Sequence, residues 1–210
     1  MKKKLFAILM SAMMLVTFMP MTAFAAEPIV GANFRSMGVG NEATFETKAV
    51  KFANEVVEGK YKLISTEEVA KLDTSKVLVV DTMPAAFSNM NRIAGAENAP
   101  IWSLSNDGID RKSELKGQQK VLLQKVADKY GKKVKKITKK VKKDNVVIDS
   151  KKKIVVSKKA KIVVYCGFVG CDRSHNGAAY LVKKGFKNVY RYAGGAAAWE
   201  DAGHTFVSAK

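Results

Sequence analysis

The sequence has two cysteines, Cys166 and Cys171, and the first directly follows an apolar run over residues 161–165. The run predicts a buried strand, and the spacing over 174–184 predicts a helix. Cys166 would then lie between the carboxyl end of a strand and a helix N-terminus, where main-chain N–H groups and the helix dipole favour a thiolate. Such a thiolate can attack a sulfane sulfur, and the same amides can hold the anionic persulfide. The alternative is a structural thiol, because free cysteines are often buried.

The loop after Cys166 contains the candidate substrate-binding residues. Its two glycines let the main chain approach a bound group closely. Arg173 could neutralise an anion, Ser174 could cap the following helix, and His175 could modulate the thiolate from the first helical turn. The full substrate-binding set is Gly167, Phe168, Val169, Gly170, Cys171, Asp172, Arg173 and Ser174, and Cys171 is also a possible resolving thiol.

The other polar residues predict structural roles. Asp81 follows the apolar run 76–80, and we expect its carboxylate to accept hydrogen bonds that order the neighbouring loops. His175 and His204 are the only histidines, and together with the two cysteines they do not have the spacing of a zinc site. We therefore expect neither a metal nor another cofactor.

These candidate residues need a scaffold, and the rest of the chain alternates predicted strands with predicted helices. Ser65 and Glu68 form a capping box at the start of one helix. Continuous apolar runs are typical of strands buried on both faces of a parallel sheet. We predict an α/β fold with a parallel central sheet flanked by helices, and a ligand site at the carboxyl ends of its strands. The predicted strands are 76–80, 99–102, 161–165 and 188–192, and the predicted helices are 43–58, 66–72, 116–130, 174–184 and 195–202.

A lysine-rich segment over about 132–160 interrupts this pattern and is interpreted as an insertion. The stretch Lys132–Lys161 holds 14 lysines and two aspartates, which accounts for +12 of the chain's net charge of +18. Two apolar runs, 146–148 and 154–156, predict a β-hairpin. The lysines could keep an exposed strand edge from aggregating, or they could contact an anionic envelope polymer or lipid surface. No aromatic residues interleave with them, so nucleic acid is not an expected partner.

The N-terminus predicts a secretory signal peptide over residues 1–25. Lys2–Lys4 form a basic start, an apolar run follows over 5–19, and Ala23–Ala25 is a typical cleavage signal. The apolar run is shorter than the roughly 20 residues of a membrane span, and retention as an anchor is the alternative. Residues 26–60 would form a leader and an extra helix. We expect a protein that is secreted or held in the cell envelope.

Several motifs, in this order along the chain, resemble those of rhodanese-like domains. The segment Ile162–Cys166 resembles the strand and catalytic cysteine of that family. Gly194-Gly195, followed by Trp199 and Gly203, resembles its closing motif. Segments 64–69, 79–81 and 93–96 resemble the opening helix cap, the first core strand and a glycine turn, and 178–190 resembles the helix and strand after the cysteine.

The resemblance covers residues 61–208, apart from the lysine-rich insertion, and carries expectations about fold and activity. It implies parallel strands flanked by helices and a persulfide formed on Cys166, with residues 167–173 around the substrate. It also implies sulfur transfer from a small donor, such as thiosulfate or a polysulfide, to a thiol acceptor. Three features depart from the usual pattern, and one of them is Asn91-Arg92-Ile93 where many members have Gly-His-Ile. Asp81-Thr82-Met83 lacks the arginine that many members carry there, and six residues separate Cys166 from Arg173 rather than four. The longer loop resembles that of a bacterial subgroup.

Four functions therefore stay open. The first is a sulfurtransferase that works through a Cys166 persulfide. The second is a thiol/disulfide redox protein that uses Cys166 and Cys171, since their five-residue spacing in a glycine loop permits closure. The third is a catalytically inactive module that binds through its lysines. The fourth, ranked last, is a phosphatase-like enzyme, because related folds use a longer loop between cysteine and arginine for phosphoryl groups.

Overall fold

The computed structural model describes residues 41–102 and 112–208. The predicted signal peptide and leader up to residue 40 lie outside the described residues. Within the described ranges, no helix is long and apolar enough to cross a membrane. The same ranges contain no group of three or more His, Cys, Asp or Glu side chains that could hold a metal ion.

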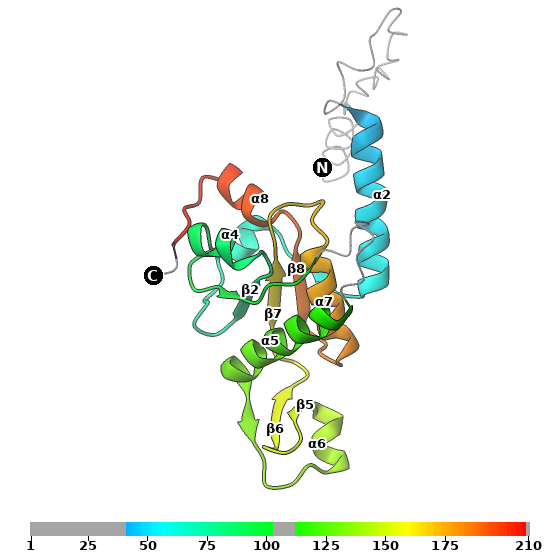
Figure 1. Ribbon diagram of the computed structural model, residues 1–210, viewed down its shortest axis with the longest axis vertical. Coiled ribbons are helices and arrows are strands. Elements are labelled where there is room, and N and C mark those ends of the chain that lie inside the picture. The colour runs from blue at the N-terminus through cyan, green and yellow to red at the C-terminus, as the bar shows by residue number, and fades with distance from the viewer. Residues whose placement is uncertain (1–40, 103–111, 209–210) are drawn as a thin grey trace, which may run out of the picture. The chain divides into compact units, whose positions relative to one another are not determined.

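A five-stranded sheet forms the centre of the fold, in the order β1-β8-β7-β2-β3 (Figure 1). Every neighbouring pair is parallel. All residues of β2 and β7 are buried, as their continuous apolar runs predicted. The prediction of a parallel central sheet is confirmed. The strands are β1 (Lys62–Leu63), β2 (Leu78–Asp81), β3 (Glu97–Asn98), β7 (Ile162–Tyr165) and β8 (Val189–Tyr192).

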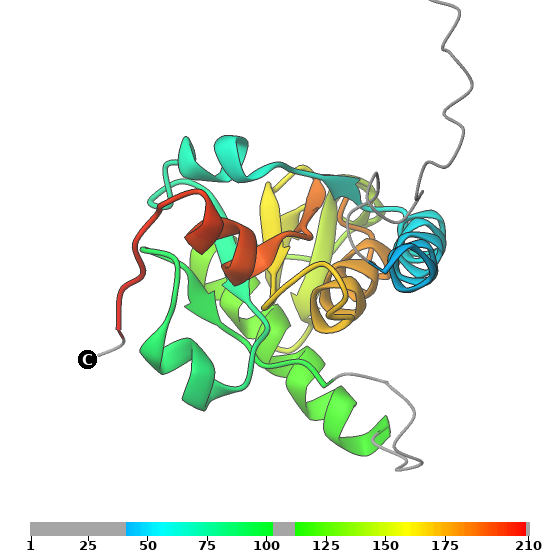
Figure 2. The ribbon, with the colours of Figure 1, turned by 90° about the horizontal axis from the view of Figure 1, so that it is seen from above.

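Helices cover both faces of this sheet (Figure 2). α5 (Lys112–Tyr130) and α7 (Arg173–Lys183) pack on the face that receives Ile162 and Val164 of β7. α3 (Thr66–Ala70) and α8 (Gly195–Asp201) pack on the opposite face, which receives Val163 and Tyr165. The alternation follows from the two-residue period of a strand. Trp199 of α8 belongs to this second core.

Local sequence explains where the first of these helices begins. Ser65 precedes α3, and its Oγ accepts a hydrogen bond from the Glu68 N–H at 3.2 Å. In return, the Glu68 carboxylate accepts one from the Ser65 N–H at 2.9 Å. The predicted capping box is therefore confirmed.

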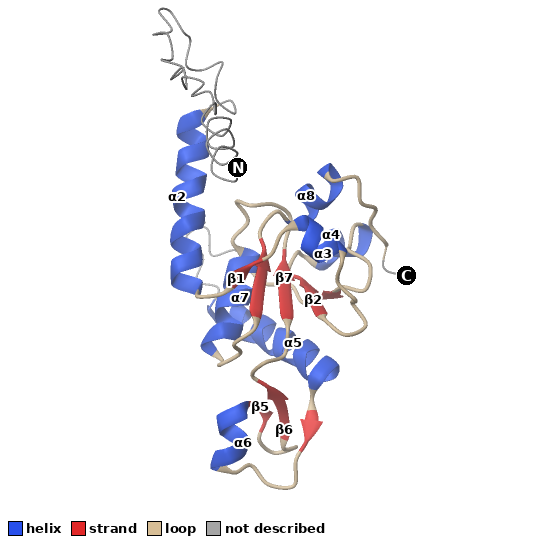
Figure 3. Cartoon of the chain, turned by 180° about the vertical axis from the view of Figure 1, so that it is seen from behind, coloured by secondary structure: helices blue, strands red, loops and turns tan. Residues whose placement is uncertain are grey.

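The lysine-rich segment forms a small antiparallel sheet in the order β4-β6-β5 (Figure 3). β5 (Asn145–Asp149) pairs antiparallel with β6 (Ile154–Ser157), and β4 (Lys132–Lys133) pairs with the other edge of β6. A helix, α6 (Lys139–Asp144), precedes β5. Val146 and Val156 are buried in the same core as Leu122 and Val126 of α5. The segment is thus joined to the domain by apolar packing, while most of its lysines are exposed.

Some elements differ from the predictions. The strand predicted at 99–102 is absent, and its neighbour β3 occupies Glu97–Asn98 instead. Pro100 lacks the N–H that a continued ladder needs, although Ala99 and Ile101 still donate to carbonyl groups at the end of β2. α4 (Ala85–Met90) and α6 were not predicted, because both are short and neither has a helical apolar period.

Candidate active site

The parallel strands bring the candidate residues to one edge of the sheet. Asp81, Tyr165 and Tyr192 end their strands in register, so that Cys166 begins its loop beside the ends of β2 and β8. The N-terminus of α8 holds the main chain at this point. Ala196 N–H donates to the Cys166 carbonyl at 2.9 Å, and Ala197 N–H donates to the Gly167 carbonyl at 2.8 Å. The cysteine is therefore fixed by the backbone of the closing motif.

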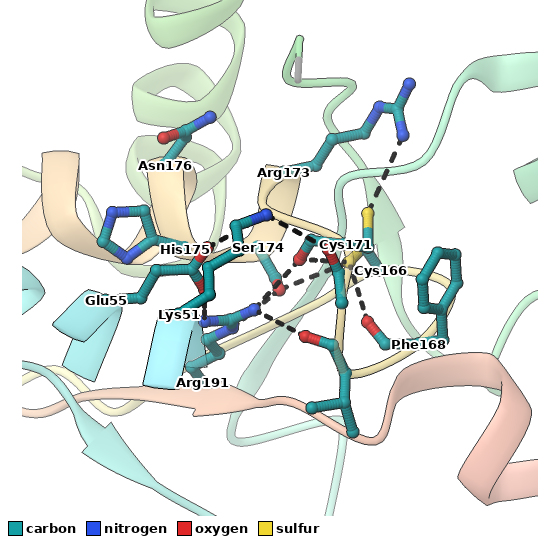
Figure 4. Close-up of polar contacts among 12 residues, drawn as sticks. Lys51, Glu55, Cys166, Phe168, Cys171, Arg173, Ser174, His175, Asn176 and Arg191 are labelled. Atoms are coloured by element: carbon teal, nitrogen blue, oxygen red, sulfur yellow. Dashed lines mark hydrogen bonds and ion pairs between the residues drawn. The ribbon is translucent and has the colours of Figure 1, made fainter. Parts of the chain in front are cut away.

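The Cys166 side chain is fully buried and faces hydrogen-bond acceptors (Figure 4). Its Sγ lies 3.3 Å from the Cys171 carbonyl oxygen and 3.9 Å from that of Phe168. The hydroxyl of Ser174 lies at 3.3 Å. Burial, together with the neighbouring Cys171, raises the pKa of the Cys166 thiol well above its ordinary value. This shift runs against the expected thiolate, while hydrogen bonds from the Ser174 hydroxyl and main-chain N–H act to lower the pKa of Cys166.

The pKa of Cys171 moves in the opposite direction. A hydrogen bond from the Cys166 thiol lowers the pKa of Cys171 to about 5, against the opposing effect of burial. The main-chain N–H and the guanidinium of Arg173, and the N–H of Gly167, add to this stabilisation. The Arg173 guanidinium lies 3.7 Å from the Cys171 Sγ. Main-chain N–H groups thus reach both sulfurs, that of Ser174 at Cys166 and those of Gly167 and Arg173 at Cys171. Both cysteines are free thiols.

The remaining loop residues divide between solvent and interior. Phe168 and Val169 expose 57% and 46% of their surface at the tip of the loop, where an incoming molecule would meet them. Ser174 does not cap α7 as predicted, because the helix begins one residue earlier and Asp172 occupies the N-cap position. Ser174 is instead buried in the first helical turn with its hydroxyl against Cys166.

His175 and Asp81 hold the surroundings of the site. The His175 Nδ1 lies 3.0 Å from the hydroxyl of Tyr61, and burial lowers the pKa of this imidazole. The His175 ring points away from both sulfurs (Figure 4), so the role predicted for His175 as a modulator has no direct contact behind it. Buried Asp81 accepts a hydrogen bond from the Met83 N–H at 2.9 Å and orders the loop after β2, as expected for a structural residue.

One residue at the centre of the site was missed by sequence reasoning. Arg191 of β8 is fully buried, and its guanidinium reaches the loop from below (Figure 4). It donates to the carbonyl groups of Cys171 and Val169 at 2.9 and 3.3 Å, and to the Ser174 Oγ at 3.0 Å. The available signal was a charged residue inside the apolar run 188–192, since a buried charge needs partners.

The sequence profile of the Rhodanese-like domain matches residues 65–202. A search of curated protein sequences found no significant match.

Among solved structures, a thiosulfate sulfurtransferase from Pseudomonas aeruginosa is 16% identical, with a TM-score of 0.47. The alignment covers 78% of this chain but 23% of that one, so this chain spans about a quarter of its length. A rhodanese-related protein from Thermoplasma volcanium is 18% identical (TM-score 0.42), with 70% and 98% of the two chains covered. The polysulfide-sulfur transferase homodimer from Wolinella succinogenes is 13% identical (TM-score 0.44), with 80% and 90% covered. Because the family profile spans most of the described fold, including the cysteine loop, this chain belongs to the rhodanese-like domain family.

Proposed function

We propose that the chain is a sulfurtransferase that carries a sulfane sulfur as a persulfide on Cys166. The observation that carries the proposal is the position of Cys166 at the carboxyl end of β7, where its Sγ lies 3.3 Å from both the Cys171 carbonyl oxygen and the Ser174 Oγ. The lowered pKa of Cys171, five residues along the same loop, makes that side chain available as a base. The family membership of the chain supports the same class of reaction. Cys171 is then the base that activates Cys166.

The first half-reaction transfers sulfur to the protein. The Cys166 Sγ attacks the outer sulfur of a sulfane donor while its proton passes to the Cys171 thiolate. The new Sγ–S bond forms as the donor's S–S bond breaks, and with thiosulfate the leaving group is sulfite. One thiolate is consumed at Cys171 and one persulfide anion is produced at Cys166, so charge balances. Arg173, beside the sulfur of Cys171, is placed to attract an anionic donor.

The second half-reaction returns the protein to its resting state. An acceptor thiolate attacks the outer sulfur of the persulfide and leaves as a new persulfide. The Cys166 thiolate that is released takes the proton back from Cys171. Phe168 and Val169 stand exposed beside this point and would contact the acceptor.

The test is intact mass spectrometry of the reduced protein after exposure to thiosulfate or polysulfide. We expect a gain of one sulfur atom that maps to Cys166 and disappears on adding a thiol. Cys166→Ser should abolish the gain, while the matched variant Cys171→Ser should slow it by about 10²-fold, the contribution typical of a general base. Equal and complete loss in both variants, with a disulfide in the untreated protein, would favour the redox function instead. A gain that maps to Cys171 would overturn the proposal.

We also propose that the protein works outside the cytoplasm, after removal of residues 1–25. The support is the basic start, apolar run and small-residue cleavage signal of the sequence. Expression in a bacterial host, followed by intact mass of the product, should give a chain that starts at Ala26. A full-length chain retained in the cytoplasm would contradict this location.

The lysine-rich segment is proposed to contact an anionic envelope polymer or lipid headgroup. Lys133, Lys151, Lys152 and Lys153 line one pocket beside β4 and β6, which supports an anionic partner. Co-sedimentation with anionic vesicles and with a soluble polyphosphate would separate the two sources. Exchange of Lys151–Lys153 for serine should weaken whichever binding occurs and should leave persulfide formation unchanged. Absence of binding to either probe at low salt would remove this proposal.

A further inference from the structure

Arg191 is a buried cation whose hydrogen-bonding capacity is fully used. Its five N–H groups make five bonds: one to Ser174, two to loop carbonyl groups, one to Tyr61 and one to Glu55. A guanidinium of this kind is costly to bury unless it is paired. Because every N–H group of Arg191 is hydrogen-bonded, the guanidinium is held in one position beneath the cysteine loop.

The hydrogen bond from Arg191 to Ser174 leaves the hydroxyl hydrogen of Ser174 available to Cys166. Arg191 Nε donates to the Ser174 Oγ at 3.0 Å, and a guanidinium cannot accept in return. The hydroxyl hydrogen of Ser174 is therefore free to point elsewhere, and the Cys166 Sγ lies 3.3 Å away. The cation thus polarises a hydroxyl that faces the sulfur. This chain of contacts, Arg191–Ser174–Cys166, is called the relay below.

The positive charge of Arg191 is balanced by a carboxylate on α2 (Glu42–Gly59), a helix that precedes the residues matched by the family profile. The carboxylate of Glu55 is buried and forms an ion pair with Arg191. Lys51, one turn earlier, lies 3.5 Å from the same carboxylate and 3.4 Å from the Gly170 carbonyl oxygen. The ring of Phe52 lies 5.3 Å from the guanidinium carbon of Arg191. α2 therefore contacts both the relay and the loop.

We propose that Arg191 is a positioning residue that stabilises an anionic sulfur at Cys166 through the Ser174 hydroxyl, and that Glu55 of α2 attenuates this effect. α2 is then part of the active site and sets the reactivity of Cys166. The role in transfer rests on the proposed function, but the relay itself can be tested without any sulfur donor.

Other charged or titratable groups lie on the elements that pack around the relay. They come from several elements, so the variants must leave them in place. These charged or titratable groups are Lys51 and Glu58 of α2, Tyr61, Asp81 at the end of β2, Cys171 and Asp172 of the loop, and Arg173 and His175 of α7.

The experiment measures the rate at which iodoacetamide alkylates Cys166 as a function of pH. A Cys171→Ser background leaves Cys166 as the sole thiol and serves as the reference. Ser174→Ala removes the donor and should move the pH midpoint upward by about 1, while Glu55→Gln removes the opposing charge and should move it downward by about 1. Opposite displacements are the signature of the relay, because a purely structural role would loosen the loop in both variants and raise the rate at every pH.

Several results would overturn the proposal. Midpoints that move in the same direction, or do not move, would show that Arg191 only supports the loop. If circular dichroism shows that Glu55→Gln is unfolded, Glu55→Asp can replace it. This variant moves the carboxylate one methylene away from Arg191 and should give a smaller downward displacement of the pH midpoint. Persulfide formation without divergent midpoints would remove the relay and keep the proposed function. Divergent midpoints without persulfide formation would support the relay and remove the proposed function.

Discussion

At the scale of single residues, the site divides two tasks between two sulfurs. Burial raises the pKa of Cys166, while hydrogen bonds from Cys166, Arg173 and Gly167 lower that of Cys171. The sequence correctly predicted a cysteine loop at the end of a buried strand. It could not predict the opposite pKa shifts of the two thiols, because these depend on the path of the loop rather than on residue spacing. Arg191 and Glu55 are 136 residues apart, so no local pattern links them.

The lowered pKa of Cys171 predicts how the stability of the protein depends on pH. Cys171 has a folded-state pKa of about 5, below the 9.0 of an unperturbed thiol. Between these values the unfolded chain binds more protons than the folded one, so the free energy of unfolding should rise from pH 5 to pH 8. Urea unfolding under reducing conditions, compared between wild type and Cys171→Ser, would measure this. The difference between the two proteins should grow over that range, and an equal or shrinking difference would contradict the assigned charge.

At the scale of elements, the cysteine loop is held by the segments on either side of it. Strands β2, β7 and β8, and helices α3, α5, α7 and α8, could be predicted because apolar runs, a capping box and glycines mark them. α4 and α6 lack such marks. The closing motif has a mechanical explanation here, since the N-terminus of α8 binds the carbonyl groups of Cys166 and Gly167.

Gly195 is predicted to be essential for that contact. It has a φ of +60°, and a Cβ atom there would lie 2.2 Å from the Cys166 carbonyl oxygen. Gly195→Ala should therefore destabilise the protein by more than the cost of about 1–2 kcal/mol for a left-handed alanine, and should lower persulfide formation. Gly203→Ala is the matched control, because its φ is +76° but nothing lies within 4 Å. Chemical unfolding of both variants would test this, and equal losses of stability would show that the approach to Cys166 is not what requires glycine.

At the scale of the whole molecule, two parts beyond the usual family pattern are joined to the domain in different ways. α2 contacts the active site through a buried ion pair. The lysine-rich segment contacts the core through apolar residues, with Val146 and Val156 packed among residues of α5 and the central strands. Composition made this segment look like a solvated insertion, because its lysines outnumber the few valines that attach it. Its apolar packing was not evident from charge alone.

This packing predicts that the lysine-rich segment unfolds together with the domain. Val156 is 1% exposed, so Val156→Ala should lower the free energy of unfolding by about 2 kcal/mol through lost burial and a residual cavity. The control Lys152→Ser changes an exposed residue of the same segment and should stay within about 0.5 kcal/mol. Scanning calorimetry of the protein should show one unfolding transition, and Val156→Ala should shift that whole transition to lower temperature. A second transition that alone responds to the substitution would mean that the segment folds independently, and α5 would then need another partner for its buried face.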